Sequence, residues 1–340
     1  MRAYVITRYG GPEAMVLQDV PVPSPGSGQV LIKVGAAGLN PVDYKMRQGK
    51  LRPLFRPRLP FIAGCELAGT VVGVGPGTNR FTAGDRVYSR VDAPGLGAFA
   101  EFACVPQELV ALMPQSLGFT EAAGLPLAGL TAVQALRDEL RIQPGTRLFI
   151  SGGAGGVGTL AIQLAKYYGA EVTTTASPRG LTLVSELGAD HVVDYTRENF
   201  AQTLRGFDAA LDAVGGRALK GVFRILKRGG SVVSVAGIPE PKTALQDLHT
   251  SRAVAALFWM ISLGVRLRAW RSGVSYRYLF MHASGDDLRF LAGLVDQGKV
   301  RPVVDSTYPL ARISDAFAAL ETGRAKGKII VTMADDGSSA

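Results

Sequence analysis

Cysteine is scarce in this sequence: only Cys65 and Cys104 occur among its 340 residues. Two thiols cannot build a disulfide framework, so the composition excludes a small disulfide-stabilised scaffold and indicates a reducing compartment. The N-terminal stretch "MRAYVITRYGGPE" also lacks the apolar run that a secretory signal peptide needs. From these absences we expect a cytoplasmic protein.

Long apolar runs are missing as well. The most apolar segment, "AVAALFWMISLG" (253–264), has 12 residues, whereas a helix that crosses a bilayer needs roughly 20. We expect this segment to be a helix that is buried or faces another subunit, in preference to an interfacial anchor. No membrane partner is therefore predicted.

Negative charge is in the minority, with 28 Asp and Glu against 37 Lys and Arg and a net charge of +9. Lys and Arg are locally dense at 52–58 and 266–271, but no nucleic-acid-binding motif accompanies them. A positive surface helps to attract an anionic ligand without identifying it. We expect a solvated basic surface and no nucleic-acid partner.

The sequence that is present falls into two halves, since 340 residues is long for one hydrophobic core. About the first 120 residues alternate short β-type runs with turns, which predicts a compact all-β lobe. From about residue 125, apolar strands alternate with helical segments, from "RLFISGG" (147–153) to a sixth strand at "YRYLF" (276–280). This pattern predicts an α/β fold with a parallel sheet covered by helices on both faces.

Three further segments carry expectations of their own. The stretch "AFAALETGRAKGKIIVTM" predicts a helix and a strand that return to the first lobe. The proline-rich "RPLFRPRLP" (52–60) predicts a flap beside a cleft, because proline prevents regular structure. The last six residues, "DDGSSA", are predicted to be disordered.

The strongest chemical signal is the turn "SGGAGGVG" (151–158), which follows an apolar strand and opens a helix. It matches G-x-G-x-x-G with Gly153, Gly155 and Gly158. Glycine lets backbone N–H groups approach a pyrophosphate, and the helix N-terminus stabilises the negative charge. Within a series of strand–helix units, this turn predicts a bound dinucleotide.

The end of the next strand indicates which dinucleotide binds. An NAD site usually places an acid there for the ribose 2′-hydroxyl. Here the strand ends "TTTASPRG", with Ser177 and Arg179 and no acid between Thr173 and Thr182. A hydroxyl and a guanidinium can bind a 2′-phosphate, so we expect NADPH in preference to NADH. The alternative is that Arg179 is only a solvated residue at a helix N-terminus.

Seven motifs together resemble one family along nearly the whole chain. In order they are "GLNPVDYKMRQG", "PFIAGCELAGTVVGVG", "GDRVYS", "AAGLPLAGLTAVQAL", "SGGAGGVGTLAIQLAKYYGA", "LGADHVVDY" and "GRAKGKIIV". They resemble the zinc-independent quinone oxidoreductase branch of the medium-chain dehydrogenase/reductase superfamily. The resemblance implies a GroES-like lobe at 1–124, completed by 306–340, a Rossmann lobe at 125–305, and a homodimer.

The same resemblance bears on "PFIAGCELAG" (60–69), where a thiol adjoins a carboxylate. Zinc-dependent relatives carry a Cys and a His where this chain has Asn40 and Cys65, and only Glu66 is kept. Catalytic zinc needs three protein ligands, so we expect no metal. Because an adjacent carboxylate raises a thiol pKa, we expect Cys65 to be a small, partly buried spacer.

Without a metal to polarise an alcohol, the natural task is reduction of an activated acceptor, a quinone or an α,β-unsaturated carbonyl. The resemblance places Asn40 near the nicotinamide. It places Tyr44 toward the substrate, where it either donates a hydrogen bond or only shapes the pocket. Asp43 and Lys45 are expected to form a surface pair.

The predicted site residues come from the turn, from the carboxyl ends of the strands and from the resemblance. The catalytic candidates are Tyr44 and Asn40. The predicted cofactor contacts are Asn40, Thr131, Gly153, Ala154, Gly155, Gly156, Val157, Gly158, Ser177, Arg179, Tyr195, Val214, Gly215, Ala236, Gly237, Ile238, Phe280 and His282. His282 is also a candidate acid, although surface placement is favoured.

Two alternatives stay open at this point. A zinc-free alcohol or aldehyde reductase would turn over saturated aldehydes. A non-catalytic NADPH-binding redox sensor would bind the cofactor without turnover of any acceptor.

Overall fold

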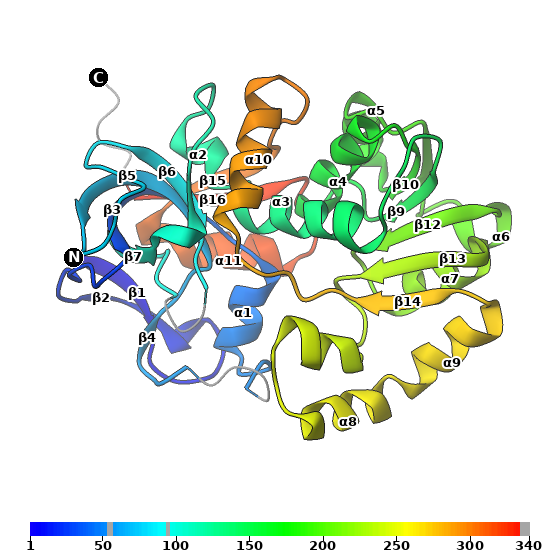
Figure 1. Ribbon diagram of the computed structural model, residues 1–340, viewed down its shortest axis with the longest axis horizontal. Coiled ribbons are helices and arrows are strands. Elements are labelled where there is room, and N and C mark those ends of the chain that lie inside the picture. The colour runs from blue at the N-terminus through cyan, green and yellow to red at the C-terminus, as the bar shows by residue number, and fades with distance from the viewer. Residues whose placement is uncertain (53–56, 93–95, 334–340) are drawn as a thin grey trace. The chain divides into compact units, whose positions relative to one another are not determined.

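The computed structural model describes residues 1–52, 57–92 and 96–333, which divide into two compact units (Figure 1). Unit 1 comprises Met1–Leu130 and Ala283–Ala340, and unit 2 comprises Thr131–His282. Residues 53–56 of the expected flap and the tail at 335–340, expected to be disordered, lie outside the described residues.

Unit 1 is built on two sheets of mainly antiparallel strands. A three-stranded sheet has the order β2-β1-β4, and a larger sheet has the order β15-β16-β3-β5-β6-β8 with β7 also paired to β3. The strands are β1 (Arg2–Ile6), β2 (Met15–Asp19), β3 (Gln29–Gly38), β4 (Phe61–Ile62), β5 (Glu66–Val74), β6 (Arg86–Arg90), β7 (Phe102–Pro106), β8 (Val110–Leu112), β15 (Val304–Pro309) and β16 (Lys328–Thr332).

Short helices connect and cover these strands. They are η1 (Pro12–Ala14), α1 (Pro41–Arg47), η2 (Gln107–Leu109), α2 (Phe119–Ala122), α3 (Pro126–Val133), which continues into unit 2, α10 (Gly285–Asp296), η6 (Leu310–Arg312) and α11 (Ile313–Glu321). The closing helix and strand of the sequence are α11 and β16. Since β16 pairs with β3 in unit 1, the predicted return of the chain to the first lobe is confirmed.

Alternating burial along β3 explains why the larger sheet forms. Val30, Ile32 and Val34 are buried on one face, and they join a core cluster that also holds Leu67 of β5 and Phe317 of α11. Period-2 alternation with one apolar face is the pattern of an antiparallel strand that packs on one side. The core of unit 1 therefore draws on both ends of the chain.

Unit 2 holds one six-stranded sheet of order β11-β10-β9-β12-β13-β14, in which every pairing is parallel. The strands are β9 (Arg147–Ser151), β10 (Glu171–Ala176), β11 (His191–Asp194), β12 (Phe207–Asp212), β13 (Leu226–Ser234) and β14 (Ser275–Tyr278). The strand order reverses between β9 and β12, as in doubly wound dinucleotide-binding folds. The predicted α/β fold and its sixth strand are confirmed.

Helices link these parallel strands. They are η3 (Gln134–Glu139), α4 (Gly156–Tyr167), η4 (Pro178–Gly180), α5 (Leu181–Glu186), α6 (Phe200–Thr203), α7 (Gly216–Ile225), η5 (Thr243–Asp247), α8 (Arg252–Ile261) and α9 (Leu263–Ser272). Helix α4 packs against β9 and β10, and α7 packs against β12 and β13. The strands are buried because helices cover them, which accounts for their near-continuous apolar sequences.

The division into units differs from the predicted one at both ends of the Rossmann lobe, which was placed at 125–305. Unit 2 ends at His282, and α10 belongs to unit 1. Tyr88 of β6 donates a hydrogen bond to the carbonyl of Leu288 in α10 at 2.5 Å, and Gly285 lies against the carbonyls of Glu108 and Val110. These tertiary contacts, which helical periodicity does not reveal, fix α10 to the β-rich unit.

Candidate functional site

The glycine-rich turn of unit 2 lies between β9 and α4. Strand β9 ends at Ser151, and α4 begins at Gly156 with Gly155 as its N-cap and no side chain capping it. The first N–H groups of this 12-residue helix have no partner within the helix, and they favour an anion at this end. Of the predicted contacts, Gly155, Gly156 and Val157 are half-buried and border this end.

Two glycines of the turn are required by close packing. A Cβ on Gly158 would lie 2.3 Å from the carbonyl oxygen of Gly152, and a Cβ on Gly153 would lie 2.1 Å from Thr174 Oγ1. Helix α4 can therefore start this close to the strands only with glycine at both positions. The turn, which also contains buried Ala154, has the backbone cradle that a pyrophosphate needs.

A buried carboxylate fixes the carboxyl ends of the three central strands. Asp212 of β12 is fully buried and accepts hydrogen bonds from Ser151 Oγ of β9 at 2.8 Å and Ser234 Oγ of β13 at 2.7 Å. It also accepts from the backbone N–H groups of Val214 and Gly215 at 3.0–3.3 Å. Two of the predicted contacts, Val214 and Gly215, are therefore positioned by a residue that the sequence analysis did not select.

Three other predicted residues gather at the ends of β10 and β11. The strands pair with Ala176 opposite Asp194, so Ser177 and Tyr195 leave the sheet next to each other. The Tyr195 N–H donates to the Ala176 carbonyl at 3.3 Å, and its side chain is exposed. Arg179 lies in η4, two residues after Ser177, and is exposed. A hydroxyl, a phenol and a guanidinium thus occupy one edge of the sheet.

One acid, Asp194, lies beside this edge. Its carboxylate accepts hydrogen bonds from Thr196, from Oγ1 at 2.7 Å and from the backbone N–H at 2.9 Å. These hydrogen bonds lower the pKa of Asp194, and Arg197 lies 3.7 Å away. The negative charge of Asp194 is therefore already stabilised by hydrogen bonds within its own turn.

The residues after β13 and β14 are held by Tyr276 and Gln134. The hydroxyl of Tyr276 donates to the carbonyl of Ile238 at 2.7 Å and accepts from its N–H at 3.0 Å, which positions the loop of Ala236, Gly237 and Ile238. Gln134, which is buried, forms hydrogen bonds with both backbone groups of His282 at 2.9 and 3.1 Å. The imidazole of His282 is exposed, as the sequence analysis favoured.

Phe280 is positioned by a buried charge network. Its N–H donates to Asp247 at 3.0 Å. Asp247 also pairs with the guanidinium of Arg277, which contacts Glu139 at 3.0 Å and Glu240 at 3.3 Å. The guanidinium thus links β14 to acids in and beside η3 and η5. Breaking any of these buried pairs would leave an uncompensated charge, so the network holds these elements together.

In unit 1, a second charged cluster surrounds Glu66. Its carboxylate is fully buried and accepts from Lys328 Nζ at 2.6 Å, Asn40 Nδ2 at 2.7 Å and the Leu127 N–H at 2.7 Å. Lys328 Nζ also donates to Asn40 Oδ1 at 2.5 Å and to the Leu39 carbonyl at 2.9 Å. Both ends of the Asn40 amide are therefore used inside unit 1, which favours a positioning role over the predicted direct contact.

Gly38 makes room for this cluster. A Cβ there would lie 2.3 Å from Glu66 Oε1 and 2.7 Å from the carbonyl of Ala123. Lys328 was not selected from the sequence, although a lysine at the start of the apolar strand "KIIVT" is a signal of a buried, paired charge.

Cys65 faces a different partner from its neighbour Glu66. The thiol is buried and donates to Asp43 Oδ1 at 3.0 Å, while Asp43 Oδ2 accepts from the Asn40 N–H at 2.8 Å. Burial raises the pKa of the Cys65 thiol well above its usual value, and it raises the pKa of Asp43 to about 6. The expected surface pair of Asp43 and Lys45 is wrong, because Asp43 is 2% exposed and caps α1 from inside.

The last two predicted residues lie in different units. Tyr44 of α1 is half-buried and packs against the core cluster of unit 1. Thr131, in α3, is buried and is the first residue of unit 2. Within residues 1–52, 57–92 and 96–333, no three His, Cys, Asp or Glu side chains converge in a way that could hold a metal ion.

Two family models match segments of this chain. Residues 26–115 match the alcohol dehydrogenase GroES-like domain, and residues 187–331 match a family described as zinc-binding dehydrogenase. An NADPH-dependent alkenal/one oxidoreductase of Arabidopsis thaliana is 39% identical over 97% of this chain and 79% of the relative.

Solved structures show the same likeness. A quinone oxidoreductase from Coxiella burnetii superposes with a TM-score of 0.84 at 32% identity, covering 98% of this chain and 99% of the other. A mycobacterial protein solved in complex with NADPH has a TM-score of 0.81 at 28% identity, covering 98% of this chain and 100% of the other.

Proposed function

The chain belongs to the medium-chain dehydrogenase/reductase superfamily, and from that membership we propose an NADPH-dependent, zinc-independent reductase. Its acceptor in this proposal is a quinone or an α,β-unsaturated carbonyl compound. The relatives named as alkenal and quinone oxidoreductases support this acceptor class.

Zinc does not fit the residues of unit 1, although one matching family is described as zinc-binding. The exclusion of zinc rests on one observation: the ammonium of Lys328 lies between Asn40 and Glu66. A zinc thiolate requires a deprotonated cysteine, but the Cys65 thiol keeps its proton, which it shares in a hydrogen bond to Asp43, and burial raises its pKa. The proposed reduction therefore uses no metal.

The turn between β9 and α4 fits a pyrophosphate, since glycines at 153 and 158 leave the backbone open to it. Bound there, NADPH would supply a hydride to the acceptor. Ser177, Arg179 and Tyr195 would hold the 2′-phosphate by hydrogen bonds and charge. Asp212 would keep Val214 and Gly215 in place at the strand ends.

On the acceptor side, Asn40 and Tyr44 are the candidates in unit 1. Asn40 would position the start of α1 through its hydrogen bonds to Glu66 and Lys328. The Tyr44 hydroxyl would donate a hydrogen bond to the oxygen that gains charge as the acceptor is reduced. Tyr44→Phe separates this role from a purely shaping one, because only the former lowers kcat with little change in KM.

The first test is an assay of the purified, chelator-treated protein. NADPH absorbance is followed with 9,10-phenanthrenequinone, a small enone and a saturated aldehyde, and NADH is run in parallel. Chelator-resistant oxidation of NADPH by the first two supports the proposal. Turnover of the aldehyde alone, restored by zinc, would overturn it. NADPH binding without any turnover would favour a redox sensor.

The choice of NADPH over NADH depends in this proposal on Arg179. Arg179→Ala is expected to raise KM for NADPH by roughly 10- to 100-fold, because a hydrogen bond to a charged group is lost. KM for NADH should change little. Arg197→Ala, at another exposed arginine near the same edge, is the matched control. An equal rise in KM for NADPH and for NADH would show that Arg179 does not bind the 2′-phosphate.

A homodimer is a further part of the proposal. Strand β14 ends the sheet of unit 2 and has no neighbour on its outer side among the described strands. A free edge offers unpaired backbone groups for pairing with a second copy. Light scattering in solution should give about twice the chain mass of 35.8 kDa, and a mass near 35.8 kDa would reject the dimer.

A further inference from the structure

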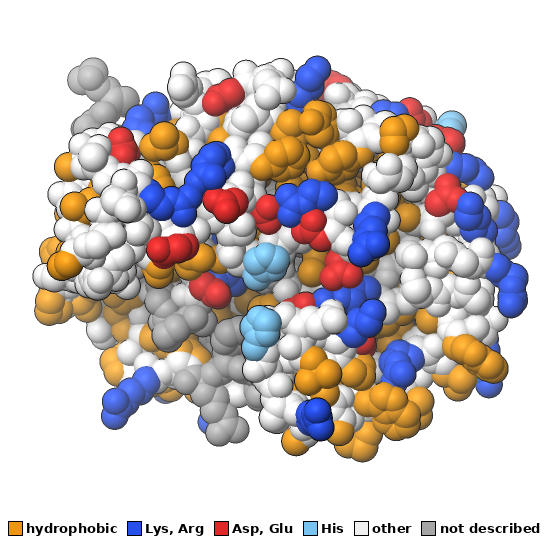
Figure 2. Space-filling view, viewed as in Figure 1, with side chains coloured by type: hydrophobic (Ala, Val, Ile, Leu, Met, Phe, Trp, Pro, Cys, Tyr) orange, Lys and Arg blue, Asp and Glu red, His pale blue; other side chains and the backbone are white. Residues whose placement is uncertain are grey.

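Helices α8 and α9 of unit 2 expose an unusual amount of apolar surface. The prediction for 253–264, a helix that is buried or faces another subunit, is wrong about burial, because most large apolar side chains of α8 and α9 are exposed. Those exposed by 40–76% are Leu257, Trp259, Met260, Ile261, Leu263, Leu267 and Trp270. Figure 2 shows the corresponding apolar atoms gathered over α8 and α9, with a Lys or Arg side chain among them.

The exposed apolar residues of α9 form a stripe that points away from the core. Leu263, Leu267 and Trp270 follow the i, i+4, i+7 spacing of one helix face. The opposite face, with Val265 and Ala269, packs into the core cluster of unit 2. The helix thus has two apolar faces, and only one of them has a partner within the described residues.

Positive charge accompanies this stripe. Residues 217–277 contain 11 Lys and Arg against two Asp and Glu, a net charge of +9. The rest of the chain has 26 of each sign, so the whole net charge comes from this segment. On α8 and α9 the charges are Arg252, Arg266, Arg268 and Arg271, and no acid lies on either helix.

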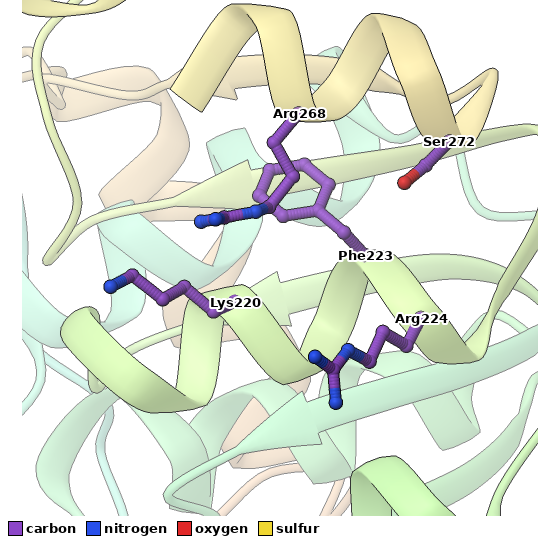
Figure 3. Close-up of a pocket in the computed structure, with 5 residues that line it drawn as sticks. All are labelled: Lys220, Phe223, Arg224, Arg268 and Ser272. Atoms are coloured by element: carbon purple, nitrogen blue, oxygen red, sulfur yellow. The ribbon is translucent and has the colours of Figure 1, made fainter. Parts of the chain in front are cut away.

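A basic cavity lies between α7 and α9 (Figure 3). It has a volume of about 190 Å³ and is lined by Lys220, Phe223, Arg224, Arg268 and Ser272. Within the part of the chain that the structure describes, no carboxylate lies within ion-pair distance of the three cationic groups. Such a site suits a phosphate group better than a neutral ligand.

We propose that the surface formed by α8, α9 and this cavity docks onto an anionic phospholipid membrane. The apolar stripe would enter the headgroup region, Trp259 and Trp270 would lie at the interface, and the cations would contact lipid phosphates. The expectation of a protein without a membrane partner is revised accordingly, and the inference is independent of the acceptor that the enzyme reduces.

The geometry favours a helix pair lying on the membrane. No single helix of the described residues is long and apolar enough to cross a bilayer; α8 and α9 together meet the length and composition criteria but are bent by 64°. Charge decides between a membrane and a second copy of the chain. A two-fold contact through α8 and α9 themselves would bring their arginines against those of the second copy, whereas anionic lipid is complementary to them.

The experiment is sedimentation of the full chain with vesicles of phosphatidylcholine alone or with 30% phosphatidylglycerol. We expect binding to the anionic vesicles only. Because Trp259 and Trp270 are the only tryptophans, their fluorescence should shift to shorter wavelength on binding. The double variant L267E/W270E should weaken binding by roughly 100-fold or more, and R224E/R268E by roughly tenfold or more.

Matched controls place the same changes elsewhere. Leu112→Glu alters an exposed leucine of unit 1, and K299E/R324E reverses two exposed charges; both should bind vesicles like the unaltered chain. Melting temperatures verify that each variant is folded. Equal binding to both vesicle types, or unchanged binding by L267E/W270E, would overturn the proposal. So would a dimer that L267E/W270E dissociates without any vesicle binding, which would identify an interface between copies.

Discussion

Lys328 is the residue on which the charged interior of unit 1 depends. It supplies the cation that contacts the fully buried carboxylate of Glu66. We predict that Lys328→Met lowers the free energy of unfolding by about 3–5 kcal/mol, because it leaves a buried charge without its partner. Urea denaturation followed by far-UV circular dichroism measures this change.

The double variant E66Q/K328M tests whether the loss is electrostatic. Replacing both partners removes the uncompensated charge, so it should be less destabilising than Lys328→Met alone. Lys299→Met, at an exposed lysine, should be nearly neutral. A double variant less stable than the single one would contradict the prediction.

Asp43 makes the stability of unit 1 depend on pH. Burial raises its pKa from 3.8 to about 6, so between these values the native state binds a proton that the unfolded state has released. The contribution of Asp43 to the free energy of unfolding is therefore present at low pH and is lost as the pH rises from about 4 to about 6. The difference between these two pKa values corresponds to about 3 kcal/mol.

The comparison with Asp43→Asn isolates this contribution. The difference in unfolding free energy between the original chain and Asp43→Asn should change by that amount between pH 4 and 7, in favour of the variant at the higher pH. Asp19→Asn, at an exposed acid, is the matched control variant. A flat difference for Asp43→Asn would show that its carboxyl titrates normally.

Among the elements, the turn before α4 could be predicted from sequence because its chemistry is local. The strand, the glycines and the helix follow one another directly, and close packing requires glycine at fixed positions. The same holds for Ser177 and Tyr195, since the carboxyl ends of neighbouring parallel strands meet at one edge.

The turn gives a prediction at this scale. Gly158→Ala should reduce NADPH affinity at least about tenfold, since its Cβ would meet the Gly152 carbonyl at 2.3 Å and displace the turn. Fluorescence titration with NADPH measures this affinity. The control is Gly293→Ala in α10, where a Cβ meets no atom within 4 Å. Equal affinity for Gly158→Ala and the control would show that the turn does not bind the cofactor.

Other elements could not be predicted, because distant residues decide them. The periodicity of α10 predicts that one face of the helix is buried, but it does not predict which unit packs against that face. The apolar sequence of α8 suggests burial, yet only one face has a partner. Likewise, the partners of Glu66 and Cys65 depend on residues 262 and 22 positions away, respectively. Local sequence fixes element types, whereas tertiary packing fixes these partners.

At the scale of the whole molecule, unit 2 is one continuous stretch, whereas unit 1 joins the two ends of the chain. Its larger sheet contains β16, which pairs with both β3 and β15. Both units therefore have their own core, but only unit 1 requires the C-terminal strand.

Removing β16 should affect the two units differently. A chain that ends at Gly327 should lose the protease resistance of unit 1, because the sheet and the Lys328 ion pair are incomplete, and unit 2 should remain resistant. Limited proteolysis with mass spectrometry identifies the protected fragments. A chain that ends at Met333 keeps β16 and is the control. Uniform digestion of both units in the shorter chain would contradict this prediction.

The position of Lys328 also sets an order of maturation during synthesis. A ribosome makes Glu66 early, and its ammonium partner follows 262 residues later. Unit 2 emerges as an unbroken segment and can fold while the chain is still attached, because all strands of its sheet are then available. The β-rich unit cannot complete its larger sheet or pair the Glu66 carboxylate until β16 has been made. We therefore expect chaperones to engage its early strands, and to release them when the last strand arrives.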